Sequence, residues 1–291
     1  MTKTTKPALS IRSGAWLKLL PVCALALGLA GCESVGGAMS AARGPGVAER
    51  VDADPKDSAA NIASLSEVVK RNPNDPEPYN TRGVAYAKIG RYQDAIADFS
   101  QAIRLDANHA PSLTNRALAY RETGRNDAAL ADFNRAIAAN PNRAGAYVGR
   151  ANLLRAQGNL GEAMGDLDNA IRLNPENAQA FHARGLIHQR QGNDTRAITD
   201  FDNAIDRDPF AAAPYQARGQ SLIAVGKYTQ AVEDFNAALN VDNRNADAWA
   251  GLGLAYEKSG NRTKASESYQ RALVVNPSHA LARDGASRVR A

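Results

Sequence analysis

The thiol of Cys32 stands where the composition of the sequence changes. The chain has 291 residues and two cysteines, and Cys32 closes the stretch LALGLAGCES, in which an apolar run turns polar at once. Such a thiol can pack in a core, form half of a disulfide, bind a metal, or act as a handle that takes a covalent group. The residues before it decide between these chemistries.

The segment ahead of Cys32 has the composition of an export signal. An apolar run extends from Leu19 to Ala30, and no acidic residue occurs before Glu33. A basic start, a short apolar stretch and small residues are typical of a secretory signal. The run falls short of the roughly 20 residues that span a bilayer as a helix, which disfavours a permanent transmembrane segment. The basic residues are Lys3, Lys6, Arg12 and Lys18.

The four residues Leu29-Ala30-Gly31-Cys32 resemble the lipobox of bacterial lipoproteins. The resemblance implies that residues 1–31 are a signal peptide and that the Cys32 thiol takes a diacylglyceryl group. Cys23 would then be discarded, which leaves no thiol pair for a disulfide. The alternative is an ordinary cleaved signal with an incidental cysteine. Two or more acyl chains anchor a protein stably, and Glu33 after the cysteine resembles the sorting pattern for the periplasmic face of the outer membrane.

Cleavage before Cys32 also changes the charge of the chain. The formal net charge of +5 falls to about +1 once the basic residues of the signal are removed. No dense cluster of Lys and Arg remains, so we expect no nucleic-acid partner. The following residues, 32–57, are rich in Gly, Ala, Ser and Pro, and this predicts a flexible tether that reaches on the order of 25 to 30 Å.

The remaining residues offer little that could catalyse a reaction. The histidines are His109, His182, His188 and His279, and His182 and His188 are too far apart around a helix to share a metal. His188 stands in a position that elsewhere holds tyrosine, which predicts a packed core residue. Nucleophile turns and phosphate loops have no sequence context here. We therefore expect no enzyme, no metal, and no cofactor other than a covalent lipid on Cys32.

Beyond the tether the sequence repeats itself every 34 residues. Apolar residues follow helical spacing up to a glycine, continue in a second helical pattern, and in four units stop at Pro141, Pro175, Pro209 or Pro277. The pattern predicts six helix hairpins over 76–279, a preceding half unit over 58–75, and a polar-faced capping helix over 280–291. We call the residues at one position of the repeat, taken across all units, a column. The glycine column holds Gly90, Gly124, Gly158, Gly192, Gly226 and Gly260.

This repeat resembles the tetratricopeptide repeat, whose pattern alternates large aromatic and small residues and ends at proline. The resemblance implies an all-α fold, a right-handed superhelical solenoid of helix-turn-helix hairpins whose units stack to bury their apolar faces. The sixth unit shows the pattern best, with Trp249, Leu252, Gly253, Tyr256, Ala265, Tyr269, Ala272 and Pro277.

Two columns depart from that pattern together. Five units carry arginine where the family usually has leucine, and aspartate sixteen residues later, whereas the sixth unit has Leu252 and Ser268. This joint exception predicts that each arginine pairs with the aspartate across its own hairpin. A ladder of arginines for ligand binding is the alternative. The pairs are Arg82 and Asp98, Arg116 and Asp132, Arg150 and Asp166, Arg184 and Asp200, and Arg218 and Asp234.

By the same resemblance, the side chains of the first helices line a concave face that binds an extended peptide or a partner helix. That face is polar and mildly basic, which favours acidic partner segments, although ordinary solvated positions explain the same residues. The candidate partner-binding residues are Asn80, Lys88, Thr114, Arg121, Asn152, Arg155, His182, Gln189, Arg190, Gln216 and Gln220.

These features together predict a non-catalytic, membrane-anchored scaffold that recruits or positions envelope proteins, such as cell-wall hydrolases, proteases or assembly factors. The architecture is similar to that of repeat-bearing bacterial lipoproteins of the NlpI type. The alternative is a structural component or pilotin of a secretion or pilus assembly that self-associates. The expected partners are envelope proteins or peptides and the membrane itself, with a homo-oligomer left open.

Overall fold

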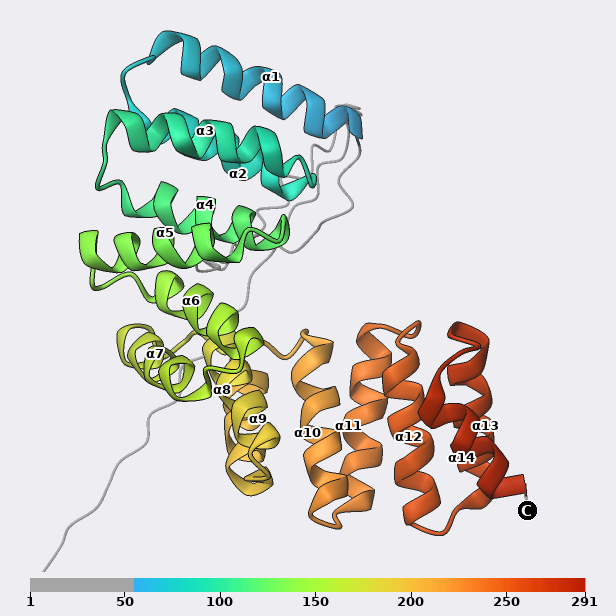
Figure 1. The fold of residues 1–291 in the computed structure, drawn as a ribbon. Helices are drawn as coiled ribbons and strands as arrows, with labels where there is room; N and C mark the ends of the chain where they lie inside the picture. Colours follow the sequence, from blue (N-terminus) through green and yellow to red (C-terminus); the bar gives the residue numbers. More distant parts are fainter. Residues whose placement is uncertain (1–54, 291) are drawn as a thin grey trace, which may run out of the picture. The chain divides into compact units, whose positions relative to one another are not determined.

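The computed structural model describes residues 55–290, which form helices joined by short turns (Figure 1). No strand occurs in this range, so the all-α prediction is confirmed. The signal segment, Cys32 and nearly all of the expected tether lie outside the described residues. The helices are α1 Pro55–Arg71, α2 Pro76–Lys88, α3 Tyr92–Leu105, α4 Ala110–Glu122, α5 Asn126–Ala139, α6 Ala144–Gln157, α7 Leu160–Leu173, α8 Ala178–Arg190, α9 Asp194–Arg207, α10 Ala212–Ala224, α11 Tyr228–Val241, α12 Ala246–Lys258, α13 Arg262–Val275 and α14 Ala280–Arg290.

Each 34-residue unit is a pair of helices that pack against each other, α2 with α3 through α12 with α13. Within each pair a glycine ends the first helix in the left-handed region, with φ between 74° and 88°. Glycine suits that position because it has no Cβ to clash with the backbone. The expected glycine column is therefore confirmed as the column of helix ends.

The second helices all end at the same point of the unit, whether or not proline follows. An Asp or Asn stands at each end, with extended backbone in five of the six units, and its side-chain oxygen accepts the backbone N–H two residues on. Such Asx turns compete with helical hydrogen bonding and so stop the helix. The sequence interpretation credited proline in four units and missed this column, which holds Asp106, Asn140, Asn174, Asp208, Asp242 and Asn276.

A row of large buried side chains, one from each second helix, runs the length of the array, with an aromatic ring in five units and Leu167 in α7. Phe99, Phe133, Phe201, Phe235 and Tyr269 are at most 1% exposed, and they come from second helices. First helices meet these rings with residues that lack a side chain: a Cβ placed on Gly83 would lie 2.6 Å from Cε1 of Phe99. Close contact between the two layers therefore depends on glycine at these positions.

The two layers of helices are packed differently along the array. Successive first helices contact one another, from α2 with α4 to α10 with α12. Successive second helices make no such contact within residues 55–290. Because the first helices are closer together, their layer lies on the inner side of the stack. We call its exposed side the first-helix face, defined by Lys88, Arg121, Asn152, Arg155, Arg190 and Gln220.

The ends of the array are closed by single helices. At one end α1 packs on α2 and begins at Pro55, inside the segment expected to be tether. At the other end α14 packs on α13 and α12, with Ala282 and Ala286 buried. Arg288 donates two hydrogen bonds of 2.8 and 3.0 Å to the Glu257 carboxylate, which fastens α14 to α12.

Candidate partner-binding face

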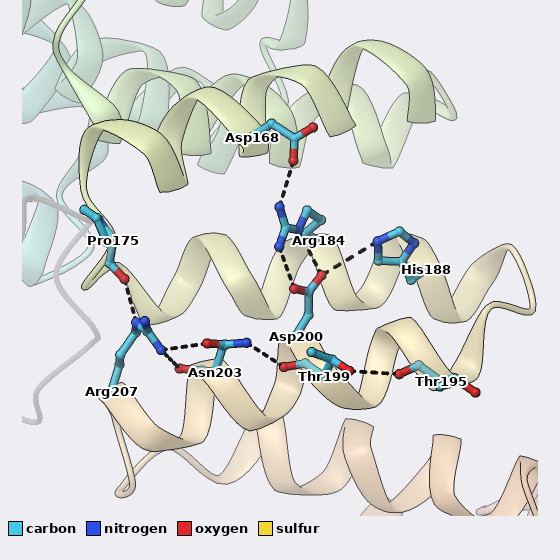
Figure 2. Close-up of polar contacts among 9 residues, drawn as sticks. All are labelled: Asp168, Pro175, Arg184, His188, Thr195, Thr199, Asp200, Asn203 and Arg207. Atoms are coloured by element: carbon cyan, nitrogen blue, oxygen red, sulfur yellow. Dashed lines mark hydrogen bonds and ion pairs between the residues drawn. The ribbon is translucent and has the colours of Figure 1, made fainter.

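The arginine and aspartate columns form five ion pairs, as predicted from their joint exception in the sixth unit. In each pair the arginine Nε and Nη2 donate to the two oxygens of one carboxylate; for Arg184 and Asp200 these bonds are 2.9 and 2.7 Å (Figure 2). The aspartate side chains are at most 9% exposed. Two parallel bonds in a buried place give a strong and directional contact.

Each arginine also reaches into the preceding unit, which the sequence interpretation missed. Nη1 of Arg184 donates to Asp168 of α7 at 2.8 Å, so the guanidinium joins two units (Figure 2). The hydrogen bonds to Asp200 and Asp168 raise the pKa of Arg184 above its ordinary value. The equivalent Nη1 acceptors are Ser66, Ser100, Asn134 and Asp202, each sixteen residues before its arginine.

The three nitrogens of each of these guanidiniums therefore donate hydrogen bonds inside the array. These five arginines, called the ladder arginines below, have 14–24% of their side-chain surface exposed. Their hydrogen bonds connect the two helices of a unit and connect each unit to the one before it. This geometry favours the structural reading of the column over a ladder that binds ligands. Burial raises the pKa of Asp234 even with Arg218 beside it, because this carboxylate is largely withdrawn from water.

Several residues expected on the binding face are engaged inside the array instead. Thr114 is fully buried and its hydroxyl donates to the carbonyl of Ala110. Asn80, which is 7% exposed, accepts hydrogen bonds from Ser112 and Asn115 of the next unit. These two side chains hold neighbouring first helices together and are not part of the exposed surface.

Two glutamines and a histidine of that set also have partners within the array. Gln189 donates to Ser221 and to a backbone carbonyl of α10, and Gln216 accepts from Asn245. His182 lies 5.8 Å from the Phe201 ring centroid to centroid. Burial, together with the charge of Arg155, lowers the pKa of His182 to about 4, so the ring is neutral at pH 7.

The remaining candidates reach the surface of the first-helix face. Lys88, Arg190 and Gln220 are exposed, and Arg121, Asn152 and Arg155 are partly exposed. Arg121, Arg155 and Arg190 come from the neighbouring helices α4, α6 and α8. Burial lowers the pKa of Arg155, and the charges of Arg190 and Arg121 lower it further. The structure thus brings three expected guanidiniums into one basic cluster.

A further guanidinium, that of Arg143, is partly buried at the start of α6, and the sequence interpretation missed it. Arg143 precedes α6 and its Nε donates to Thr114 at 2.9 Å. Burial lowers its pKa. Asn177 and Asn245 occupy the same column in other units and cap their helices through side-chain oxygens. An arginine cannot accept such a bond, so its presence in a column of capping residues was a usable signal.

Each of the other histidines lies near a single carboxylate and not at a shared metal position. Nε2 of His109 lies 3.1 Å from Glu77, and Nε2 of His279 lies 2.9 Å from Asp247. His188 is partly buried, 3.8 Å from Asp200. In the described part of the chain no three metal-binding side chains lie together. None of the helices described there is long and apolar enough to cross a membrane.

The repeat matches known family models along most of the described chain. Models described as "Tetratricopeptide repeat" match residues 76–109, 114–170, 178–210 and 246–279, and one described as "TPR repeat" matches 151–192 and 219–260. The chain belongs to the tetratricopeptide repeat family, whose members are in general non-catalytic modules that bind peptides or proteins. No curated protein sequence matches the chain.

Solved structures share the same architecture. One is the APC/C hetero-tetramer Cut9-Hcn1, with 18% identity and a TM-score of 0.71 over 80% of this chain; only 46% of that chain is covered. PilF of Pseudomonas aeruginosa has 16% identity and a TM-score of 0.68, with 75% and 99% covered. YrrB, described as a TPR protein with an unusual peptide-binding site, has 25% identity and a TM-score of 0.55, with 65% and 97% covered.

Proposed function

We propose that this protein is an exported, lipid-anchored scaffold that binds other envelope proteins through its first-helix face and catalyses no reaction. The observation that carries the proposal is the contrast between two sets of arginines. Each nitrogen of the five arginines paired with aspartate donates a hydrogen bond inside the array, whereas Arg121, Arg155 and Arg190 present a basic cluster to solvent. The likeness to YrrB supports a peptide as the kind of ligand.

The anchor rests on the lipobox resemblance at Cys32. A lipidated Cys32 places the array at the periplasmic face of the outer membrane, on a tether that leaves its orientation free. A single contact with a peptide is often weak, around micromolar, but confining both partners to a thin layer raises their effective concentration. Anchoring and binding then contribute to one function.

A non-catalytic role agrees with the chemistry of the described residues. The buried carboxylates are paired with arginine, and the one histidine with a strongly lowered pKa, His182, is packed against Phe201. A general base needs access to its substrate. The array therefore acts by positioning its partners.

The proposal is tested in envelopes of the native host with the wild-type chain and the Cys32→Ser variant. We expect labelled fatty acid to be incorporated only into the wild type, which should fractionate with the outer membrane and co-purify with a small set of envelope proteins after crosslinking. The variant, if exported and folded, should lose those partners. Full function of a soluble periplasmic Cys32→Ser form would show that no anchor is needed.

A second candidate function is that of a self-associating component of a secretion or pilus assembly. Light scattering distinguishes it from the scaffold. A monomer over a wide concentration range supports the scaffold. A concentration-dependent oligomer that does not dissociate when a partner is added favours the assembly component. Variants at the exposed ends of the array would then be tested first.

A further inference from the structure

We propose that Arg121, Arg155 and Arg190 bind the carboxylates of an acidic, extended segment of a protein partner. This inference rests on the proposed function, since it names the class of ligand for the first-helix face. It goes further in committing to a charge, to three residues and to units two to four of the array.

The three guanidiniums lie on successive first helices that contact one another, α4, α6 and α8. Arg155 stands between the other two, and Nη1 of Arg190 lies 3.5 Å from the backbone oxygen of Arg155. Like charges held this close repel each other in a partly desolvated place. A ligand that brings negative charge removes that repulsion, so binding is favoured most at Arg155.

The array supplies little countercharge of its own here. Arg121 contacts Glu122 at 2.9 Å, a pair that is about one third exposed on each side. His182, whose pKa is lowered by burial and by the charge of Arg155, is neutral at pH 7. A partner must therefore provide the remaining carboxylates.

One donor in the cluster also lacks an acceptor. Nε of Arg155 is out of contact with solvent and has no hydrogen-bond partner among residues 55–290. An unsatisfied buried donor is costly, and more so when it is charged. By contrast, Nε of every ladder arginine has a carboxylate oxygen within 2.9 Å. A bound carboxylate that turns the Arg155 guanidinium toward itself would supply the missing acceptor.

A protein segment fits this arrangement better than nucleic acid or an isolated anion. The guanidiniums are spread over three helices instead of converging on one point, so several separate carboxylates are needed. The flanking groups suit a peptide backbone, because Asn152 offers a partly exposed amide and Leu186 a partly exposed apolar side chain on the same layer. A nucleic-acid track needs many more phosphate contacts than this face provides.

The test uses the full mature chain, lipidated and held in nanodiscs of neutral phosphatidylcholine, with two fluorescent peptides. One peptide alternates glutamate and serine, and the other has glutamine in place of glutamate. We expect the glutamate peptide to bind, the glutamine peptide to bind about ten-fold more weakly or worse, and the affinity for the first to fall as salt is raised.

Matched variants locate the binding. The triple variant Arg121→Gln, Arg155→Gln and Arg190→Gln should bind the glutamate peptide about ten-fold more weakly, or worse, than the wild type. Arg244→Gln is the control, because Arg244 is an exposed arginine in the turn before α12 whose side chain has no partner in the described residues. It should leave binding within about two-fold. Circular dichroism should show wild-type helicity in both proteins, since neither change touches the ladder.

Three outcomes overturn the inference: no binding of the glutamate peptide, equal binding of the two peptides, or undiminished binding by the folded triple variant. Co-purification from crosslinked envelopes distinguishes failure of this inference from failure of the proposed scaffold function. Partners that are retained by the triple variant leave the scaffold standing and move its site elsewhere. If the wild type captures no partner at all, the proposed function itself fails, whatever the peptides show.

Discussion

Arg150 and Asp166 face each other across one hairpin and share two parallel hydrogen bonds of 2.8 and 2.7 Å. The carboxylate is 6% exposed, whereas the arginine is 24% exposed and also donates to Asn134 of the preceding unit. The third contact is with a neutral side chain. This pair therefore tests the ladder without leaving a second carboxylate behind.

Arg150→Leu should lower the free energy of unfolding by about 2–4 kcal/mol, because it leaves the buried carboxylate of Asp166 without a countercharge. The double variant Arg150→Leu with Asp166→Ser should recover most of that loss, since the sixth unit carries Leu252 and Ser268 at these positions. Urea unfolding of the three proteins gives the comparison. Equal midpoints for the single and double variants would argue against pairing as the source of stability.

Gly251→Ala should destabilise the array strongly. A Cβ on Gly251 would lie 2.4 and 2.5 Å from two atoms of the Phe235 ring, which is fully buried and has no room to move. We expect a loss of about 2–3 kcal/mol from overpacking. The control is Gly165→Ala in α7, where no atom lies within 4 Å of the new Cβ.

Because alanine is the better helix former, Gly165→Ala should raise stability by up to about 1 kcal/mol. Thermal melts of the two variants should therefore shift in opposite directions. A shift in the same direction for both would mean that helix propensity, and not contact with the aromatic row, governs these glycines.

His182 should make stability depend on pH between about 4 and 6.5. Its pKa is lowered from 6.5 to about 4, mainly by burial and then by Arg155. The unfolded chain therefore binds more protons in this range, and the free energy of unfolding falls as the pH falls from 6.5 toward 4. The contribution of this residue is roughly 2–3 kcal/mol over the range.

Denaturant unfolding of the wild type and of His182→Gln at pH 7, 5.5 and 4.5 measures this term. Carboxylates titrate in both proteins, so the informative quantity is the difference between the two slopes. Parallel curves would show that His182 takes up its proton as easily in the folded array as in the unfolded chain.

Asp242→Ala should cost more stability than Asn174→Ala. Both side chains accept a backbone N–H two residues on and stop their helix. Pro175 also restricts the turn after Asn174, whereas Asn243 follows Asp242 and leaves the Asx turn to act alone. We expect about 1 kcal/mol for Asp242→Ala and clearly less for Asn174→Ala, measured by thermal melts. Equal losses would show that proline contributes nothing to the stop.

The sequence by itself determined the period, the class of fold and the pairing of two columns. Those features depend on contacts that recur every 34 residues, so a column of glycine or of arginine reports the same environment six or five times. The joint replacement by Leu252 and Ser268 was enough to identify pairs that the structure confirms. It is also the sequence, through Cys32, that carries the whole expectation of a lipid anchor.

Only the tertiary structure decided which polar side chains remain free. Thr114 and Gln189 occupy columns of the expected binding face, yet both are engaged by neighbouring units. The rotation between successive hairpins likewise decides the third contact of each ladder arginine. It also decides that Arg121, Arg155 and Arg190 lie in one cluster. Periodicity assigns a residue to a face of its helix, but burial and hydrogen bonding there depend on atoms of the next unit, which local spacing does not specify.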